Sequence, residues 1–314
     1  MTSASAALCE LLGIERPIVQ AGMGFVTTGR LAAAVSGAGG LGVVATGGYM
    51  RADELRAHVE RVRDEAPGRS FGVNLLFSGG ASGDEFGNAA LLRAQLDVCV
   101  GERVPVVIGG FGDPRPALPE LRAAGIRFLA VVGSTRAALR MAEAGADAVI
   151  VSGFEAGGHV GRVGTLTLAQ SALRALDLPV LVAGGVATRA AVEAALGLGA
   201  GGVSVGTRFV ASEESDAHPG FKQAVVDAGE GDTAVTRALT GKPNRGLRTP
   251  FVEAWIERDS EIESFPGRAR EHWWRSRSAI VDGNLVEGFA PMGECSALVG
   301  SVLPAATIVE QLAP

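Results

Sequence analysis

Eight short hydrophobic runs recur along the first two thirds of the chain. They are rich in β-branched residues or flanked by glycine, and most are almost entirely apolar rather than alternating. Such runs are typical of strands buried on both faces of a parallel sheet. They occupy residues 17–23, 41–46, 71–77, 104–110, 127–133, 148–153, 179–185 and 202–209.

Segments with helical spacing of apolar positions lie between these runs. They are rich in Ala, Leu, Arg and Glu and include residues 28–37, 51–65, 88–100, 134–144, 165–176 and 188–196. Strands that alternate with helices build βαβ units, and eight such units are what a closed barrel requires. We therefore predict an α/β fold, a (β/α)8 TIM barrel, with a C-terminal helical elaboration.

One motif favours the competing architecture, an open doubly wound sheet. Gly37, Gly39 and Gly42 match the pattern G-x-G-x-x-G. A dinucleotide-binding fingerprint follows a strand and opens a helix, whereas these glycines follow a predicted helix and lead into a strand. We interpret them as the end of a helix and a tight turn.

The alternating pattern ends after residue 209. Residues 230–285 are richer in charge, Pro and Trp and contain no further βα unit, and the tail has apolar residues at helical spacing. We predict a barrel built from residues 1–229 and 286–314, with residues 230–285 as a mainly helical cap packed on it. The Gly- and Ser-rich segment 78–87 is where we expect a flexible loop beside the site.

Composition and charge exclude several classes of partner and site. The 314 residues are 47% hydrophobic and carry a net charge of −6 without a Lys/Arg cluster, which argues against nucleic acid or a membrane surface as partner. No apolar run reaches the ~18 residues of a membrane span. Cys9, Cys99 and Cys295 show no metal-like spacing, so we expect no metal site and a cytoplasmic protein with reduced thiols.

Glycines follow the seventh and eighth predicted strands, at Gly184-Gly185 and at Gly206-Thr207. In (β/α)8 enzymes the active site lies at the carboxyl ends of the strands, and these two loops often bind phosphate through backbone N–H groups. Short turns are the alternative explanation. We favour a phosphate site, which implies a phosphorylated substrate or a cofactor such as FMN.

The sixth predicted strand runs into a glycine-rich loop that contains His159. Histidine suits proton transfer near neutral pH, and a barrel scaffold gives it little reason to stand there. We predict that His159 is catalytic. Glu155, in the same loop, either lines the substrate pocket, orients the histidine or is a solvated carboxylate.

Two further strand ends carry candidate residues. Asn74 interrupts the buried third strand, so its amide needs a partner, either a ligand heteroatom or a neighbouring loop backbone. Gly22 and Met23 end the first strand, where small residues let a flat ring lie on the backbone. The alternative there is a turn with a core methionine.

Together these segments resemble the nitronate monooxygenase family, formerly called 2-nitropropane dioxygenases, whose superfamily also holds FMN-dependent enoyl-[acyl-carrier-protein] reductases. TGKPNRGL at 240–247 resembles the monooxygenase branch. The most specific motifs are PIVQAGMG at 17–24, AAAVSGAGGLGVV at 32–44, FGVN at 71–74, EAGGHVG at 155–161, LVAGGVAT at 181–188 and VGTRFVASEESDAHP at 205–219.

The resemblance implies an FMN cofactor, with the flavin ring near Gly22, Met23 and Asn74. It implies that the FMN phosphate lies on Gly184, Gly185, Gly206 and Thr207.

The resemblance also implies a reaction. An alkyl nitronate or nitroalkane would be oxidised with O2, and His159 would be the base that acts on the carbon next to the nitro group. The same site serves the reductases, so an NAD(P)H-dependent reductase of enoyl thioesters or quinones remains the alternative. A small-molecule substrate is expected in either case, and a homodimer stays open.

Two positions depart from the family pattern. Ser204 stands where these families often carry Gln before the GTRF turn, and Ser152 stands where many have Gln or Glu at the end of the sixth strand. Both shorten a polar side chain near the expected flavin. We place Ser152 in the expected substrate pocket, and the departures leave the electron donor open.

Overall fold

The computed structural model describes residues 2–77 and 89–314. The segment 78–87, where we expect a loop beside the site, lies outside the described residues.

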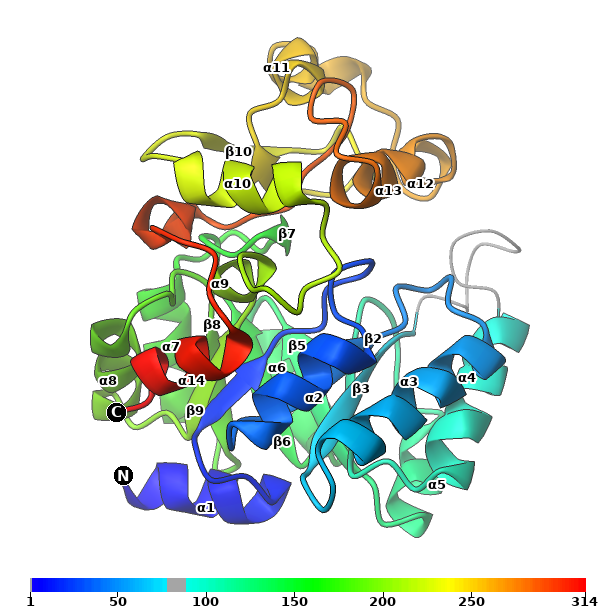
Figure 1. Cartoon of the computed structure of the whole chain (residues 1–314), viewed down its shortest axis with the longest axis vertical. Coiled ribbons are helices and arrows are strands. Elements are labelled where there is room, and N and C mark those ends of the chain that lie inside the picture. The colour runs from blue at the N-terminus through cyan, green and yellow to red at the C-terminus, as the bar shows by residue number, and fades with distance from the viewer. Residues whose placement is uncertain (1, 78–88) are drawn as a thin grey trace.

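Eight parallel strands form the centre of the molecule (Figure 1). Each pairs with the next in the order β1-β9-β8-β6-β5-β4-β3-β2, and a parallel bridge between Val19 and Leu41 closes the ring between β1 and β2. The predicted barrel and its eight strands are confirmed. The strands are β1 (Ile18–Gln20), β2 (Gly42–Ala45), β3 (Phe71–Leu76), β4 (Val106–Gly110), β5 (Arg127–Val132), β6 (Ala148–Ser152), β8 (Val180–Ala183) and β9 (Gly202–Val205).

Helices surround this barrel and bury the outer faces of its strands. The C-terminal helix α14 begins at residue 305 and packs against α2 and α8, so the chain's apolar tail contacts the barrel helices. The surrounding helices are α2 (Gly29–Gly37), α3 (Ala52–Glu65), α4 (Ala89–Gly101), α5 (Leu118–Ala123), α6 (Thr135–Ala144), α7 (Thr165–Ala175), α8 (Arg189–Gly197) and α14 (Ala305–Leu312).

One end of the barrel is closed by the N-terminal helix α1 (Ser3–Leu12). Leu8 and Leu12 pack against side chains that point into the barrel from several strands, among them Val19 and Leu181. These inward side chains form a filled core, as expected for an eight-stranded barrel. The carboxyl ends of the strands lie at the opposite end, where (β/α)8 enzymes carry their active sites.

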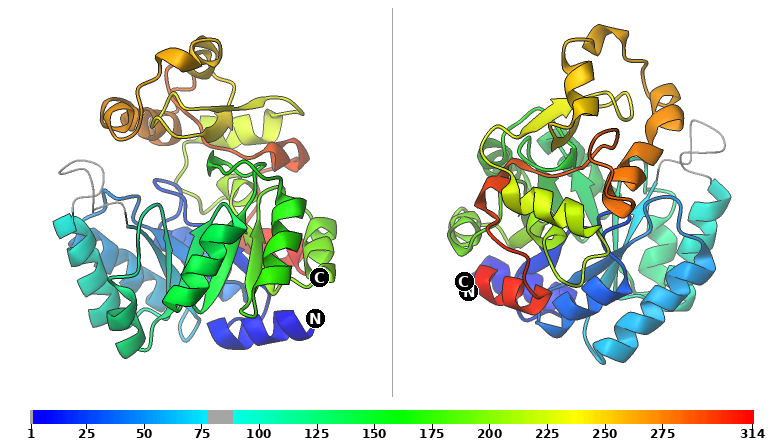
Figure 2. Two further views of the ribbon diagram at one scale, coloured as in Figure 1. Left: turned by 180° about the vertical axis from the view of Figure 1, so that it is seen from behind. Right: turned by 45° about the horizontal axis from the view of Figure 1, so that its top comes forward.

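The cap, defined as residues 230–285, lies across this opposite end (Figures 1 and 2). It follows the short helix α9 (Thr207–Val210) and helix α10 (Pro219–Asp227), and the one-turn η2 (Glu294–Leu298) leads back to α14. Its elements are β10 (Thr233–Thr236), β11 (Asn244–Leu247), α11 (Pro250–Ile256), η1 (Asp259–Glu261), α12 (Gly267–His272) and α13 (Trp274–Val281).

Strands β10 and β11 form an antiparallel hairpin that the sequence analysis does not predict. The hairpin continues into β7 (Gly158–His159), which comes from the loop after β6, so that Asn244 pairs with His159. Arg245 reinforces this junction. Its buried guanidinium donates to the carbonyl of Phe154 and to the hydroxyl of Thr233, and it pairs with Glu294 at 2.9 Å.

The glycine motif at 37–42 has the structure that we infer from the sequence. Helix α2 ends at Gly37, Gly39 has a φ of +88°, and Gly42 begins β2. A side chain at Gly42 would meet the carbonyl of Ala32, so this glycine allows the helix to pack closely on the strand.

Within residues 2–77 and 89–314, no helix is long and apolar enough to cross a membrane.

Candidate active site

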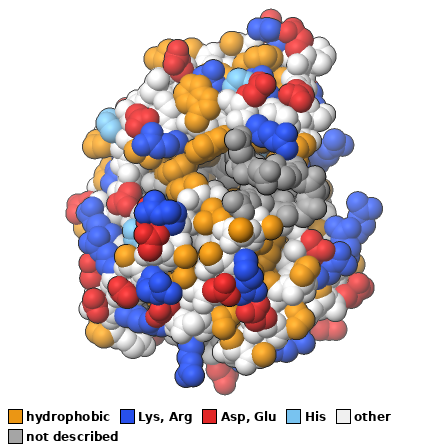
Figure 3. All heavy atoms as spheres, turned by 90° about the vertical axis from the view of Figure 1, so that its right-hand side faces the viewer, with side chains coloured by type: hydrophobic (Ala, Val, Ile, Leu, Met, Phe, Trp, Pro, Cys, Tyr) orange, Lys and Arg blue, Asp and Glu red, His pale blue; other side chains and the backbone are white. Residues whose placement is uncertain are grey.

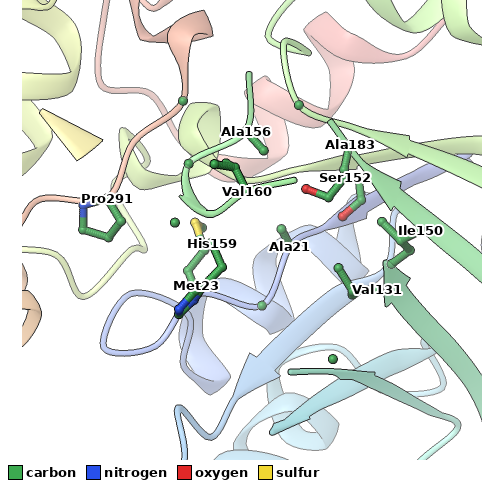
Figure 4. A pocket seen from close by; sticks show the side chains of 18 of the residues that line it. Ala21, Met23, Val131, Ile150, Ser152, Ala156, His159, Val160, Ala183 and Pro291 are labelled. Carbon is green, nitrogen blue, oxygen red and sulfur yellow. The ribbon is translucent and has the colours of Figure 1, made fainter. Parts of the chain in front are cut away.

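A cavity of about 620 Å³ opens at the carboxyl ends of the barrel strands, beneath the cap (Figure 4). In Figure 3 hydrophobic side chains gather in a hollow between the cap and the barrel. The cavity volume lies within the range of roughly 300–1,000 Å³ that small-molecule sites occupy. The predicted residues that line it are Gly22, Met23, Asn74, Ser152, His159, Gly184, Gly185, Gly206 and Thr207.

The loop after β1 and the end of β3 meet at the floor of this cavity. A Cβ atom at Gly22 would lie 2.4 Å from the Cβ of Asn74, so only glycine permits the approach. Asn74 donates from Nδ2 to the carbonyl of Ile108 at 3.2 Å. The backbone of a neighbouring strand therefore accepts from the amide nitrogen of Asn74, and its Oδ1 remains to accept a hydrogen bond from a ligand. Ser152 and Ser204 lie on the same floor.

Backbone groups dominate the part of the cavity formed by the last two barrel strands. Gly184 and Gly185 have φ values of +97° and +74°, and Thr207 directly follows Gly206. The Thr207 hydroxyl accepts from the N–H of Gly293 at 2.9 Å, which leaves its proton for another acceptor.

The same four residues suit a phosphate. A Cβ at Gly184 would lie 2.8 Å from the Thr165 hydroxyl, and one at Gly206 would face the Met23 sulfur at 3.5 Å. The bare backbone thus reaches the cavity at both strand ends, where N–H groups and a hydroxyl are the donors that bind phosphate. The residues present fit the phosphate of FMN.

Strand β7 places His159 over the cavity, with its ring 4.5 Å from the ring of Phe111. His159 is exposed to the open cavity, and Phe111 and Thr240 lie beside its ring. Desolvation by the protein around the site, and then the Lys242 ammonium, lower the pKa of His159 to about 4. The imidazole is therefore neutral at pH 7.

Thr240 lies directly beside this histidine. Its Oγ1 is 3.0 Å from Nε2 of His159 and accepts from Nδ2 of Asn244 at 2.9 Å. Both Thr240 and Asn244 are buried in the cap. The hairpin therefore fixes the position and also the hydrogen bonding of the histidine.

Lys242 brings a positive charge to the cavity. Its Nζ lies over the rings of Phe111 and Phe265, at 4.4 and 4.1 Å from their centroids. Partial burial lowers the pKa of this lysine. Within the described part of the chain it forms no ion pair with a carboxylate, so its charge is available to an anion in the cavity.

Glu155 does not line the cavity. Its carboxylate accepts from the N–H and from the hydroxyl of Thr165, both at 2.8 Å, at the first residue of α7. A carboxylate at a helix N-terminus satisfies free N–H groups and opposes the helix dipole. The structure therefore places Glu155 at the start of a barrel helix rather than beside His159.

The site also has residues that the sequence reasoning missed: Lys242, Phe111 and Cys295 line the cavity, and the buried Thr240 contacts His159. Lys242 and Thr240 lie within the motif at 240–247, which is noted as a family motif but not assigned to the site. Phe111 follows the fourth strand with an unusual φ of +58°, and Cys295 is a buried thiol beside the Thr207 loop. The position of Phe111 at a strand end is a signal that could have identified it.

Comparisons with known proteins place the whole chain in one family. The model of the nitronate monooxygenase family matches residues 5–314. FabK from Thermotoga maritima is 39% identical, with a TM-score of 0.88 over 98% of this chain and 94% of that one. The nitroalkane oxidase of Streptomyces ansochromogenes is 32% identical, with a TM-score of 0.87 over 98% of this chain and 96% of that one.

A third relative is a Rhodococcus jostii dehydrogenase of an octahydro-indene carboxyl-CoA. It is 35% identical over 270 residues, which cover 86% of this chain and 73% of the relative. The family match spans nearly the whole chain and includes both the barrel and the cap. The chain belongs to the nitronate monooxygenase family, and it is a flavin-dependent oxidoreductase.

Proposed function

We propose that the protein binds FMN and oxidises alkyl nitronates with O2, and that His159 is the general base when a neutral nitroalkane is the substrate. One observation carries this proposal: a lysine without a carboxylate partner among the described residues and a neutral histidine face the same cavity. A nitronate is a small anion, so the lysine charge favours its binding over that of a neutral molecule.

The glycine loops support the FMN part of this proposal. The phosphate would be held by Gly184, Gly185, Gly206 and Thr207, and the ring would lie near Gly22, Met23 and Asn74. When bound, FMN would supply the electron acceptor for the substrate and the route for electrons to O2.

The side chains act on the substrate in two ways. Lys242 lies 4.4 Å from the Phe111 centroid, and that centroid lies 4.5 Å from the His159 ring, so its charge is within about 9 Å of the histidine. An anion beside His159 is thus attracted and oriented by Lys242. The neutral imidazole is the group that would accept a proton from the carbon next to a nitro group.

A second candidate is an NAD(P)H-dependent reductase of enoyl thioesters or quinones. The likeness to FabK and to a carboxyl-CoA dehydrogenase favours this class. The strand ends and loops at the cavity are mostly Gly, Ala, Val and Ile, which an acyl chain would also contact favourably.

The test uses the purified protein loaded with FMN, mixed without O2 first with the nitronate of 2-nitropropane and then, in a separate sample, with NADH or NADPH. We expect bleaching of the flavin absorbance by nitronate and not by the pyridine nucleotide. Fast bleaching by NADH or NADPH alone would favour the reductase. A protein that takes up no FMN would contradict both candidates.

A further inference from the structure

Three polar groups contact the hydroxyl of Thr240, and only one assignment of donors and acceptors satisfies all three contacts. Oγ1 lies 2.9 Å from Nδ2 of Asn244, 3.4 Å from the backbone N of Lys242 and 3.0 Å from Nε2 of His159. A hydroxyl has one proton to donate and two lone pairs that accept. The roles within this cluster can therefore be assigned by counting.

The orientation of the Asn244 amide is fixed by a second contact. The same Nδ2 lies 2.7 Å from the carbonyl oxygen of Lys242, and a carbonyl only accepts. Because Asn244 is buried, its amide nitrogen must face both oxygens. It donates one proton to the Lys242 carbonyl and the other to the Thr240 hydroxyl.

The remaining contacts follow from this assignment. The Lys242 backbone N–H is also a donor, so both lone pairs of the Thr240 oxygen accept protons. Its own proton then goes to Nε2 of His159. A neutral imidazole has one bare nitrogen and one N–H, so Nε2 is the bare nitrogen and Nδ1 carries the proton.

The backbone around this cluster holds it in place. Asn244 is paired with His159 across the β11–β7 ladder, and the N–H of Val160 donates to the carbonyl of Pro243 at 3.1 Å. Thr240 is 2% exposed, so water does not compete for its hydroxyl. The pKa of His159, lowered to about 4, agrees with a neutral ring.

We propose that Thr240 is a positioning residue that occupies the only basic nitrogen of His159 and so makes the protein selective for nitronates over neutral nitroalkanes. The substrate part of this inference rests on the proposed function, whereas the protonation state of the ring does not. A nitronate arrives without its carbon-bound proton and needs no base. The Nδ1–H group is left as a hydrogen-bond donor for an anionic oxygen.

A nitroalkane needs one more step. Its C–H bond breaks, the electron pair stays on the nitroalkane as the nitronate, and the proton goes to Nε2 of His159. This transfer requires the Thr240 hydroxyl to turn away from Nε2 first. Thr240 therefore opposes nitroalkane oxidation without opposing nitronate oxidation.

The first experiment measures the histidine directly. The FMN-loaded protein is labelled with 15N-histidine, and two-bond 1H–15N spectra show which ring nitrogen carries the proton. The chain has only four histidines, and His159→Gln identifies the signal of interest. We expect the Nδ1–H form of His159 in the unmodified protein, and observation of the Nε2–H form would overturn the inference.

Variants then test selectivity. Thr240→Val removes the hydroxyl and keeps the shape, so we expect kcat/KM for 2-nitropropane relative to its nitronate to rise about 5-fold, the value of one hydrogen bond. Thr240→Ser keeps the hydroxyl and should restore both the ratio and the spectrum. Thr236→Val is the matched control, because this buried cap threonine accepts from the N–H of Ala238.

The outcomes separate the two proposals. If Thr240→Val leaves both the His159 spectrum and the substrate ratio unchanged, Thr240 does not position the histidine. If the unmodified protein shows the Nδ1–H form but oxidises no nitronate, the assignment of the ring proton stands and the selectivity claim falls with the proposed function.

Discussion

Replacing Lys242 by methionine tests whether the cavity selects an anion. Methionine keeps an unbranched apolar side chain between Phe111 and Phe265 and removes only the charge. Lys242→Arg keeps the charge and is the matched control. If the lysine recognises a nitronate, the methionine variant loses activity on the anion and retains activity on the neutral nitroalkane.

The size of the effect follows from the distances in the site. Nζ is within about 9 Å of the His159 ring, where two unit charges interact by about 1.8 kcal/mol at an effective dielectric constant of about 20 and by about 0.5 kcal/mol in bulk water. These energies correspond to changes of about 20-fold and about 2-fold. Because Lys242 is partly exposed at the cavity, we expect a loss of kcat/KM for the nitronate between these limits.

The assay compares steady-state kinetics on the nitronate of 2-nitropropane and on 2-nitropropane itself, at low and high ionic strength. A charge effect shrinks as salt rises, whereas a packing defect does not. Equal losses on the anion and on the neutral substrate would show that Lys242 acts through packing. A loss of less than 2-fold on the anion would refute its role in recognition.

Three further perturbations have defined outcomes. The folded pKa of His159 is about 4 and the unfolded value is about 6.5, so the unfolded chain binds more protons between these pH values. The stability that the neutral His159 contributes is present above pH 6.5 and is lost as pH falls toward 4. In denaturant titrations, the free energy of unfolding of His159→Gln should therefore fall less on acidification than that of the unmodified protein. Gly184→Ala places a Cβ 2.8 Å from the Thr165 hydroxyl at a φ of +97°, so fluorescence titration should show FMN affinity weakened about tenfold or more. Gly197→Ala, which adds a Cβ in open space, is the control and should bind FMN normally. Arg245→Met removes two hydrogen bonds of a buried guanidinium and its ion pair with the half-exposed Glu294, and it should lower the free energy of unfolding in urea by about 2 kcal/mol. An unchanged midpoint would show that this arginine does not anchor the cap.

The barrel could be predicted because its signals are local. A strand buried on both faces must be apolar along its whole length, and the residues between strands must repeat at helical spacing. The carboxyl ends of all eight strands meet at one end of a barrel, so Asn74, Gly184 and Gly206 could be assigned to one cavity from their places along the chain.

The cap hairpin could not be predicted in this way. Its strands have the sequences TAVT and NRGL, which are short and partly polar, and their partner β7 has only two residues. Such strands form because they pair with each other and with a distant loop. The sequence does not contain that pairing as a local pattern, so Thr240 and Lys242 were not placed beside His159. Glu155 shows the converse, since its closeness to His159 along the chain suggests a contact, whereas its carboxylate binds the start of α7.

The barrel carries the groups that fit the flavin, and the cap carries groups that face the substrate, so one family could support different reactions. The groups that fit a flavin phosphate belong to barrel loops, which are held by the β8 and β9 strands. The groups that set the protonation of His159 and the charge of the cavity, Thr240 and Lys242, belong to the cap hairpin. Substitutions in a few hairpin residues can therefore change which substrate is bound and whether a base is available, while the flavin site keeps its geometry. Exchange of residues 240–244 between relatives should consequently alter the ratio of nitronate to nitroalkane oxidation more than it alters FMN affinity.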